Sequence, residues 1–326
     1  SPAEANAVHA NDSATTLAKA WRANADALHT LLLADAAPTL ALPPPGAILP
    51  RAAAAASAYV MSYDNGEQLL AHLARDWAAT GRRARRRVYG PLMRALPGRR
   101  PLRILVPGAG ACRLAWELAR RGHRVEATDV SASMLVAARA IIGGGMRALP
   151  IQPHARCESG ALRREACLAI ELRPDVRPSR AASSRLSLQL ADFLEPSEGS
   201  GATWDRIVSA YFIDTIANPA RTIARARALL RPGGRWLNTG PLLWHDDGAG
   251  LLRLTADELR SLLECGGFLV LRWRVLRSVE YLPRSRNGWM SRPAASHSLL
   301  FFEAKRLEQA HPPGGRSFSC VDASSD

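Results

Sequence analysis

Two glycines and one aspartate near the middle of the chain have the types and the spacing of a ribose-binding turn. Gly108 and Gly110 follow the short apolar run at 104–106, and Asp129 ends the next apolar run, 21 positions after Gly108. Glycines let the backbone approach a ligand closely, and a carboxylate at this spacing accepts hydrogen bonds from ribose hydroxyls. The three residues therefore predict a site for a ligand that carries a ribose.

The third position of the glycine pattern narrows the class of ligand. The string GAGACR puts Arg113 where the dinucleotide fingerprint GxGxxG has a glycine that lets helix and strand pack closely, which argues against NAD. S-adenosyl-L-methionine has ribose and adenine without a pyrophosphate, so the first two glycines and the acid suffice for it. Asp192 and Phe193, after a later apolar run, suit its adenine amine and ring. Taken alone, this pair is equally a turn capped by Asp192 with Phe193 in the core.

The elements that must position these residues are those of an α/β fold. Short apolar runs alternate with helical patterns from Arg103 onward, which is typical of βαβ units. Ser131 and Thr255 are predicted N-caps, and Thr255 forms a capping box with Glu258. The predicted strands are 104–106, 124–128, 186–190, 206–211, 235–238, 268–275 and 299–304, and the later helices are 131–142, 219–230 and 255–265. We expect a Rossmann-like, doubly wound, mostly parallel seven-stranded sheet.

Composition and periodicity divide the chain into four parts. Residues 1–50 are Ala-rich, contain a weak helical pattern and end near a Pro-Pro-Pro-Gly breaker, so we predict a weakly structured segment. Residues 51–100 form a predicted N-terminal helical extension. The sheet domain covers 101–306, with an insertion at about 143–185 that lacks steady periodicity, and 307–326 is predicted to be a flexible tail.

The strong positive charge has two interpretations. The formal net charge is +14, but only Lys19 and Lys305 are lysines, and this dominance of arginine indicates biased composition rather than a nucleic-acid surface. One cluster of arginines either binds an anionic partner or lies on a solvent-exposed helix face, and we favour the exposed face. It consists of Arg82, Arg83, Arg85, Arg86 and Arg87. Nucleic acid is therefore not an expected partner.

The cysteines and the apolar runs bear on the compartment. The five cysteines are scattered and none lies in a CxxC pair, so we predict neither a disulfide framework nor a metal site. No apolar run reaches the roughly 20 residues that cross a bilayer, and no charged-then-apolar leader is visible. We expect a cytoplasmic protein without membrane contact; a nuclear location and a homodimer are left open.

Longer strings resemble the carnosine N-methyltransferase family. They are ARDWAATGRRARRRVY, ILVPGAGACRLAWELARRGHRVEATDVSASML, LADFLE, WDRIVSAYFIDT and RPGGRWLNTGPLLWH, in order over residues 70–305 apart from the insertion. The resemblance implies that 101–306 is an S-adenosyl-L-methionine-dependent methyltransferase domain. It further implies methyl transfer to an imidazole nitrogen of a histidine-containing, carnosine-like dipeptide or of a peptide.

The resemblance also implies roles for individual residues. Arg75 would bind the carboxylate of the cofactor's methionine part, and His72 stands where the family has a glutamine that contacts the cofactor. The other implied cofactor residues are Gly108, Gly110, Asp129, Asp192, Phe193 and Ala210. Asp214 and His245 match the family residues that hold the substrate imidazole.

The chemistry of methyl transfer is consistent with those two roles. In-line displacement needs a nitrogen with a free lone pair, and a carboxylate that accepts from the distal N–H fixes that neutral tautomer and stabilises the developing charge. We predict this role for Asp214 and an orienting role for His245. Viewed alone, the segment favours a helix-capping role for Asp214, and the alternative for His245 is a loop position facing solvent.

Two further alternatives concern the acceptor and the class of protein. The tyrosine-rich stretch that lines the family's substrate pocket has no counterpart in residues 292–297. Either Tyr281 or Trp289 substitutes for it, or the acceptor is another imidazole dipeptide or a protein histidine. An RNA methyltransferase that uses the arginine-rich surface and a non-catalytic cofactor-binding homologue are the competing functions.

Overall fold

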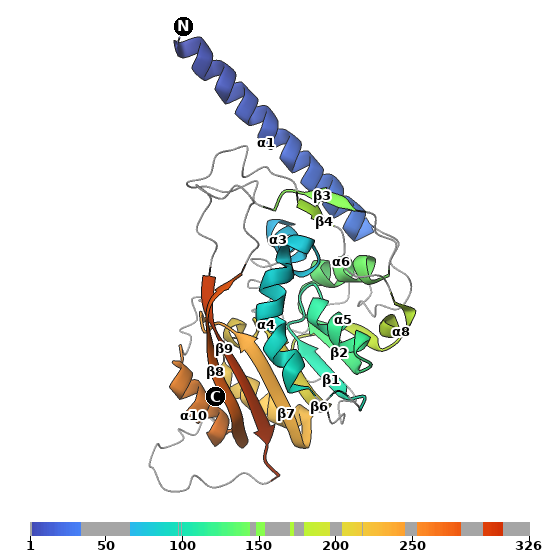
Figure 1. Cartoon of the computed structure of the whole chain (residues 1–326), viewed down its shortest axis with the longest axis vertical. Coiled ribbons are helices and arrows are strands. Elements are labelled where there is room, and N and C mark those ends of the chain that lie inside the picture. The colour runs from blue at the N-terminus through green and yellow to red at the C-terminus, as the bar shows by residue number, and fades with distance from the viewer. Residues whose placement is uncertain are drawn as a thin grey trace.

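The computed structural model describes residues 2–33, 66–96, 98, 100–143, 148–153, 170–172, 179–195, 204–216, 218–244, 253–281 and 296–308. At its centre is a seven-stranded sheet with the strand order β5-β2-β1-β6-β7-β9-β8 (Figure 1). The strands are β1 (Arg103–Pro107), β2 (Arg124–Asp129), β5 (Leu186–Leu190), β6 (Trp204–Ala210), β7 (Leu230–Gly240), β8 (Phe268–Glu280) and β9 (Ser296–Arg306). Only β9 runs antiparallel to its neighbours, so the predicted mostly parallel, seven-stranded α/β sheet is confirmed.

Helices cover both faces of the sheet because successive strand residues point to opposite sides. In β1, Ile104 and Val106 belong to one core cluster, and Leu105 between them belongs to another. The first cluster includes residues of α3 (Gly66–Asp76), α4 (Arg82–Ala95), α5 (Arg113–Arg120) and α6 (Ala132–Ile142). The second includes residues of α9 (Pro219–Leu229) and α10 (Ala256–Cys265). The sheet is therefore doubly wound, as expected.

The predicted helix starts are confirmed in detail. Ser131 Oγ accepts from the backbone N–H of Met134 at 3.2 Å. Thr255 and Glu258 form the reciprocal capping box at the start of α10. Asn218, which the sequence did not single out, caps α9 by accepting from the N–H of Arg221 at 3.0 Å.

Three strands are longer than their apolar patterns predicted. The strands β8 and β9 pair antiparallel from Phe268–Arg306 to Glu280–Ser296, well beyond the expected ends of both. The strand β7 starts at Leu230, but its pairing with β6 passes from Trp204–Leu230 to Arg206–Arg235, so the Arg-Pro-Gly-Gly segment between them interrupts the ladder, with a φ of +73° at Gly233. Backbone pairing with a neighbouring strand continues a ladder through residues whose side chains carry no strand pattern, and periodicity does not detect this.

Regular elements also occur in the N-terminal segment, which was predicted to be weakly structured, and in the insertion, which lacked steady periodicity. Helix α1 (Pro2–Leu33) has 32 residues, and its far end projects away from the other elements (Figure 1). Asn24 of α1 exchanges hydrogen bonds of 2.9 and 2.7 Å with the backbone of Gln152. Within the insertion lie α8 (Arg180–Ser183) and the antiparallel pair β3 (Leu149–Ile151) and β4 (Ile170–Leu172). No helix in the described ranges combines the length and apolarity needed to span a bilayer.

Candidate functional site

The predicted site residues gather at one edge of the sheet, where the parallel strands end. The turn after β1, the end of β2, the turn after β5 and the segment after β6 all lie at this edge. The chain winds outward in both directions from the neighbouring strands β1 and β6, and ligands of open α/β sheets bind at such a switch point. The topology therefore places the candidate site beside the glycine turn.

The glycine turn has the conformation that its sequence predicted. Gly108 and Gly110 have φ of +56° and +51°, values that L side chains rarely adopt. A Cβ on Gly108 would lie 2.4 Å from Cδ2 of Phe212, whereas a Cβ on Gly110 would point into open space. The turn thus packs tightly on its Phe212 side and has room for a ligand beside Gly110.

Asp129 is held against this turn by backbone hydrogen bonds. Its Oδ2 accepts from the N–H of Gly110 at 2.6 Å, and its Oδ1 accepts from the N–H of Ser131 at 2.9 Å. Each carboxylate oxygen has a second lone pair, so ribose hydroxyls still find acceptors there. The geometry therefore fits the role predicted for Asp129.

Arg113, the residue that replaced the third fingerprint glycine, connects α5 to the N-terminal helices. Its Nη1 donates to the backbone carbonyl of Asp76 at 3.1 Å, and its guanidinium lies 5.0 Å from the ring centroid of Trp77. Its Nε and Nη2 both donate to Glu117. A bulky side chain at this position therefore fastens the helical extension to the sheet domain.

Asp192 and Phe193 show the capped turn and the core position that the sequence allowed. Oδ1 of Asp192 accepts from the N–H of Leu194 at 2.8 Å, which is a side-chain-capped turn. Phe193 is buried in the second core cluster, and its ring meets that of Phe212 edge-on at 5.3 Å between centroids. Oδ2 of Asp192 remains for another donor, so the adenine role stays a prediction.

Arg75 lies buried at the end of α3 in an ion pair with its neighbour. Its Nε and Nη2 donate to the two oxygens of Asp76, each at 2.9 Å, and its guanidinium lies about 5 Å from the rings of Tyr211 and Tyr281. Burial disfavours the charge on Asp76, but the charge and hydrogen bonds of Arg75 outweigh it and hold the pKa of Asp76 below its ordinary value. Nη1 of Arg75 has no hydrogen-bond partner within the described ranges. It is free to meet an anionic group.

His72 lies on the same helix and faces Tyr281. Its Nε2 is 3.0 Å from the Tyr281 hydroxyl, and its buried Nδ1 has no partner among the described residues. Burial, and after it the charge of Arg75, lowers the pKa of His72 to about 3. The ring is therefore neutral at physiological pH, with one nitrogen as donor and the other as acceptor.

Asp214 lies in the short 3₁₀ helix η2 (Ile213–Thr215) that follows β6. Its Oδ2 accepts from the backbone N–H of Leu243 at 3.1 Å, and its buried Oδ1 has no partner in the part of the chain that the structure describes. Burial raises its pKa to about 6, and the backbone hydrogen bonds of Leu243 and of Asp214 itself act in the opposite direction. The alternative that Asp214 caps a helix is wrong, because its carboxylate bonds to the segment after β7 and Asn218 caps α9.

Tyr211 connects Asp214 with the Arg75 pair. It has a φ of +55°, which is unusual for a residue with a side chain, and its hydroxyl has no partner in the described ranges. Its ring packs edge-on against that of Tyr281 at 5.0 Å between centroids. Backbone strain of this kind concentrates at functional sites. Tyr211 was not predicted from the sequence as a site residue, although it directly precedes the Phe-Ile-Asp-Thr string.

The remaining predicted residues are placed less centrally or fall outside the described ranges. Ala210 ends β6 and packs partly buried against two core clusters. Tyr281 also faces His297, with 5.7 Å between ring centroids. His245 and Trp289 lie outside the described residues. No three His, Cys, Asp or Glu side chains lie close enough to hold a metal ion within the described ranges.

Comparisons with known proteins point to one family. A family model described as carnosine N-methyltransferase matches residues 53–302. Carnosine N-methyltransferase of Mus musculus is 30% identical over 219 residues, which cover 63% of this chain and 54% of that protein. Carnosine N-methyltransferase unmet of Drosophila melanogaster is 29% identical over 216 residues, which cover 62% of this chain and 47% of that protein. The chain spans about half the length of the curated relatives it matches.

A solved structure shows a weaker likeness. The crystal structure of magnesium protoporphyrin IX methyltransferase from Synechocystis PCC 6803 with bound SAM aligns with 77% of this chain and 97% of that chain. The TM-score is 0.44 and the identity is 14%. Similarity at this level carries no information about activity, and the fold assignment rests on the strand order.

Proposed function

Because the chain belongs to the carnosine N-methyltransferase family, we propose that it transfers a methyl group from S-adenosyl-L-methionine to an imidazole nitrogen of a histidine-containing dipeptide or peptide. The observation that carries the proposal is the carboxylate of Asp214. One of its oxygens is fixed by Leu243, and the other is buried without a partner among the described residues. A buried carboxylate oxygen without a partner is costly, and a ligand N–H would satisfy this one.

The residues around the glycine turn fit the proposed cofactor. Gly110 has open space beside it, and Asp129 presents carboxylate lone pairs at the same place. Arg75 retains one N–H group for a carboxylate, and a planar guanidinium suits that partner. When bound, the cofactor supplies a methyl group on a positively charged sulfur. In this assignment, Gly108, Gly110, Asp129, Asp192, Phe193, Ala210, His72 and Arg75 surround it.

Asp214 would act on the acceptor by holding one tautomer of its imidazole ring. If Oδ1 accepts from the distal N–H, the other ring nitrogen keeps its lone pair and faces the methyl group. As the ring gains positive charge, the buried carboxylate stabilises it in a site of low dielectric constant. The acceptor is already neutral, so the reaction needs no strong base, and the ring proton leaves afterwards through Asp214 or solvent.

In this proposal, Tyr281 forms the aromatic wall beside the methyl acceptor, in place of the tyrosine-rich stretch of the family. Its hydroxyl lies against His72, and its ring faces Arg75, Tyr211 and His297. The flat imidazole ring of the acceptor would pack against this aromatic surface. The orienting role of His245 remains part of the proposal.

The proposal has a cellular and an oligomeric part. Cys112 and Cys265, the cysteines within the described ranges, form no disulfide with each other, which suits a cytoplasmic location with the nucleus as the alternative. A homodimer is a further prediction, and light scattering of the purified chain would measure its mass.

The decisive test incubates the chain with labelled S-adenosyl-L-methionine and a panel of acceptors. The panel holds carnosine and other imidazole dipeptides, histidine peptides, and RNA. We expect label on an imidazole nitrogen, and mass spectrometry of the product would identify which one. Label on RNA with none on imidazole would favour the competing RNA methyltransferase, and cofactor binding without transfer to any member would favour the non-catalytic homologue.

A further inference from the structure

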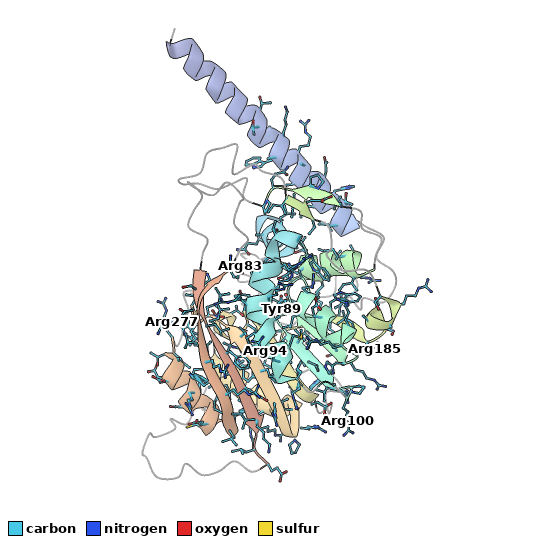
Figure 2. All side chains as sticks on the ribbon, in the orientation of Figure 1. Arg83, Tyr89, Arg94, Arg100, Arg185 and Arg277 are labelled. Atoms are coloured by element: carbon cyan, nitrogen blue, oxygen red, sulfur yellow. The ribbon has the colours of Figure 1, made fainter. Side chains whose placement is uncertain are left out.

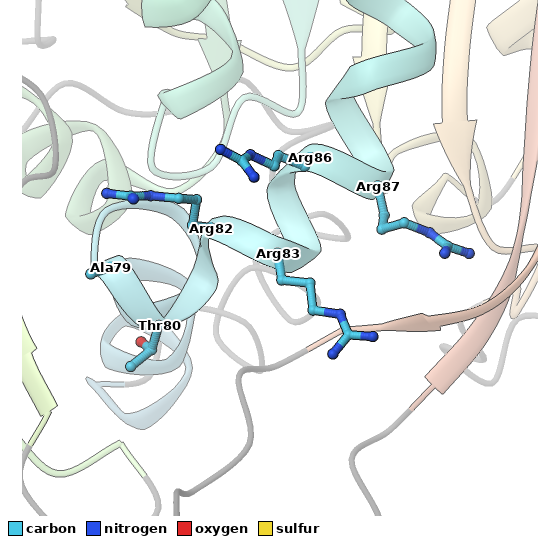
Figure 3. A pocket seen from close by; sticks show the side chains of 6 residues that line it. All are labelled: Ala79, Thr80, Arg82, Arg83, Arg86 and Arg87. Carbon is cyan, nitrogen blue, oxygen red and sulfur yellow. The ribbon is translucent and has the colours of Figure 1, made fainter.

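An arginine-lined hollow lies at the start of α4, apart from the residues assigned to methyl transfer. Its volume is about 420 Å³, within the range of small-molecule sites (Figure 3). Its lining consists of Ala79, Thr80, Arg82, Arg83, Arg86 and Arg87. No acidic and no aromatic side chain is among these residues.

The positive charge of this hollow is concentrated along the sequence. Between Asp76 and Glu117 the chain has no acidic residue, and α4 itself carries six arginines. Arg82 and Arg86 are four residues apart, as are Arg83 and Arg87, so each pair puts two positive charges side by side on the helix. Like charges at this spacing destabilise a helix, and an anion bound between them removes the repulsion.

The arginines that line the hollow rest on a fixed turn. Figure 3 shows Arg82 and Arg86 on one side of the helix, and Arg83 and Arg87 on the other. Arg85, between the pairs, points inward, and its Nη1 donates to the backbone carbonyls of Arg75 at 2.6 Å and Ala78 at 2.9 Å. The turn that carries the hollow is therefore pinned to the body of the protein.

We propose that this hollow binds the polyphosphate group of a small anionic ligand. The exposed arginines carry planar guanidinium groups, which suit a phosphate group, and Nη2 of Arg87 also donates to the backbone carbonyl of Arg277 at 3.1 Å. A diphosphate or triphosphate concentrates several negative charges within such a volume, whereas an extended acidic peptide spreads its carboxylates over up to about 3.3–3.6 Å of chain per residue. Single-stranded nucleic acid normally stacks its bases on aromatic rings, which the lining lacks.

The test measures binding to the full chain by calorimetry at about 150 mM ionic strength, where distant surface charges are screened. The probes are inorganic triphosphate, adenosine triphosphate, tricarballylate as a carboxylate probe, and a short single-stranded RNA. We expect one saturable site for both triphosphates and weaker binding of tricarballylate and RNA. Tighter binding of adenosine triphosphate than of inorganic triphosphate would identify a nucleotide as the ligand.

Matched charge removals locate the site. The double variant Arg83→Gln/Arg86→Gln removes one arginine from each pair, and Arg94→Gln/Arg100→Gln removes the same charge elsewhere. All four side chains are exposed, and Figure 2 shows Arg94 and Arg100 away from Arg83. We expect the first variant to weaken triphosphate binding at least tenfold and the second less than threefold. The single variant Arg83→Gln provides the same comparison if the double variant does not fold.

Three results would overturn the proposal. The first is the absence of saturable binding of triphosphate at millimolar concentration. The second is an equal loss in both double variants, which would mean that net charge alone attracts the anion. The third is tighter binding of RNA than of either triphosphate, which would make the hollow part of a nucleic-acid surface.

Discussion

The two sides of the candidate site differ in how their polar atoms are satisfied. On the β1 and β2 side, both oxygens of Asp129 accept backbone N–H groups from the turn and from the start of α6. On the opposite side, one polar atom each of His72, Arg75, Tyr211 and Asp214 has no partner among the described residues. We call the β1 and β2 side the complete side, because the oxygens of Asp129 already accept hydrogen bonds. The side of His72, Arg75, Tyr211 and Asp214 is the incomplete side.

This difference indicates which side would accept any ribose-containing ligand and which side would select particular ligands. The glycine turn and its carboxylate are built from backbone hydrogen bonds, so any ligand with a ribose would find them ready. A buried polar atom without a partner costs about 1–3 kcal/mol, and such atoms persist at sites where a ligand supplies the partner. In the proposed function, the incomplete side is therefore the one that would recognise the acceptor and the charged end of the cofactor.

The largest expected effect comes from removing the charge on the incomplete side. Asp214→Asn keeps the shape and the Leu243 contact but loses the carboxylate, so turnover should fall by about 10³-fold. Binding of S-adenosyl-L-methionine, measured by calorimetry, should change less than threefold. Asp129→Asn is the matched control on the complete side and should lose cofactor binding instead. Loss of the cofactor in the Asp214 variant would break the division between the sides.

The substitution Asp214→Asn should also stabilise the fold at neutral pH. Burial raises the pKa of Asp214 to about 6 from an ordinary value of 3.8, so between these values the folded state holds a proton that the unfolded state has lost. Stability therefore falls as pH rises from about 4 to 6, and the ionised carboxylate costs roughly 3 kcal/mol at pH 7. Denaturant unfolding should show Asp214→Asn more stable than the wild type by up to this amount at pH 7. The two curves should converge below about pH 4, and a constant difference at all pH values would contradict the assignment.

Replacing a glycine of the turn with alanine should weaken cofactor binding through steric conflict alone. Gly108→Ala places a Cβ 2.4 Å from Phe212 at a φ of +56°, so we expect a loss of about 2 kcal/mol in stability and about 30-fold in cofactor affinity. Gly110→Ala has a similar φ of +51° but open space, and should cost only about 1 kcal/mol of stability. Thermal unfolding and calorimetry would measure both variants. Equal stability losses would mean that the Phe212 contact is unimportant.

The smallest expected effect sharpens the role of the aromatic wall. Tyr281→Phe removes the hydroxyl that meets His72 and keeps the ring, so KM for the acceptor should rise about fivefold with kcat nearly unchanged. Tyr89→Phe is the control, because that hydroxyl donates to Asp76 at 3.2 Å. An identical rise in KM for both variants would assign the effect to the Arg75 pair rather than to the acceptor.

Much of the complete side could be predicted from the sequence because its interactions are local. Gly108 and Gly110 follow β1 directly and Asp129 ends β2, the next strand, while the N-caps Ser131 and Thr255 bond to residues three positions away. Spacing along the chain fixes such contacts before the rest of the fold is known.

The incomplete side could not be predicted in the same way. The contact between His72 and Tyr281 joins residues 209 positions apart, and no spacing rule anticipates it. Arg75 was predicted to bind the cofactor, but its ion pair with Asp76 and its place between two tyrosine rings came only from packing. The long pairing of β8 with β9, which brings Tyr281 near His297, extends beyond the apolar pattern for the same reason.

By itself, the sequence determined the doubly wound sheet, the glycine turn and the family, because periodicity, glycine placement and contiguous motifs are properties of neighbouring residues. Only the tertiary structure decided which polar atoms are buried without partners and that Asp214 bonds to the segment after β7 instead of capping a helix. Burial and distant contacts depend on how separate elements pack, and the free energy of a charged group depends on that environment more than on its position in the chain.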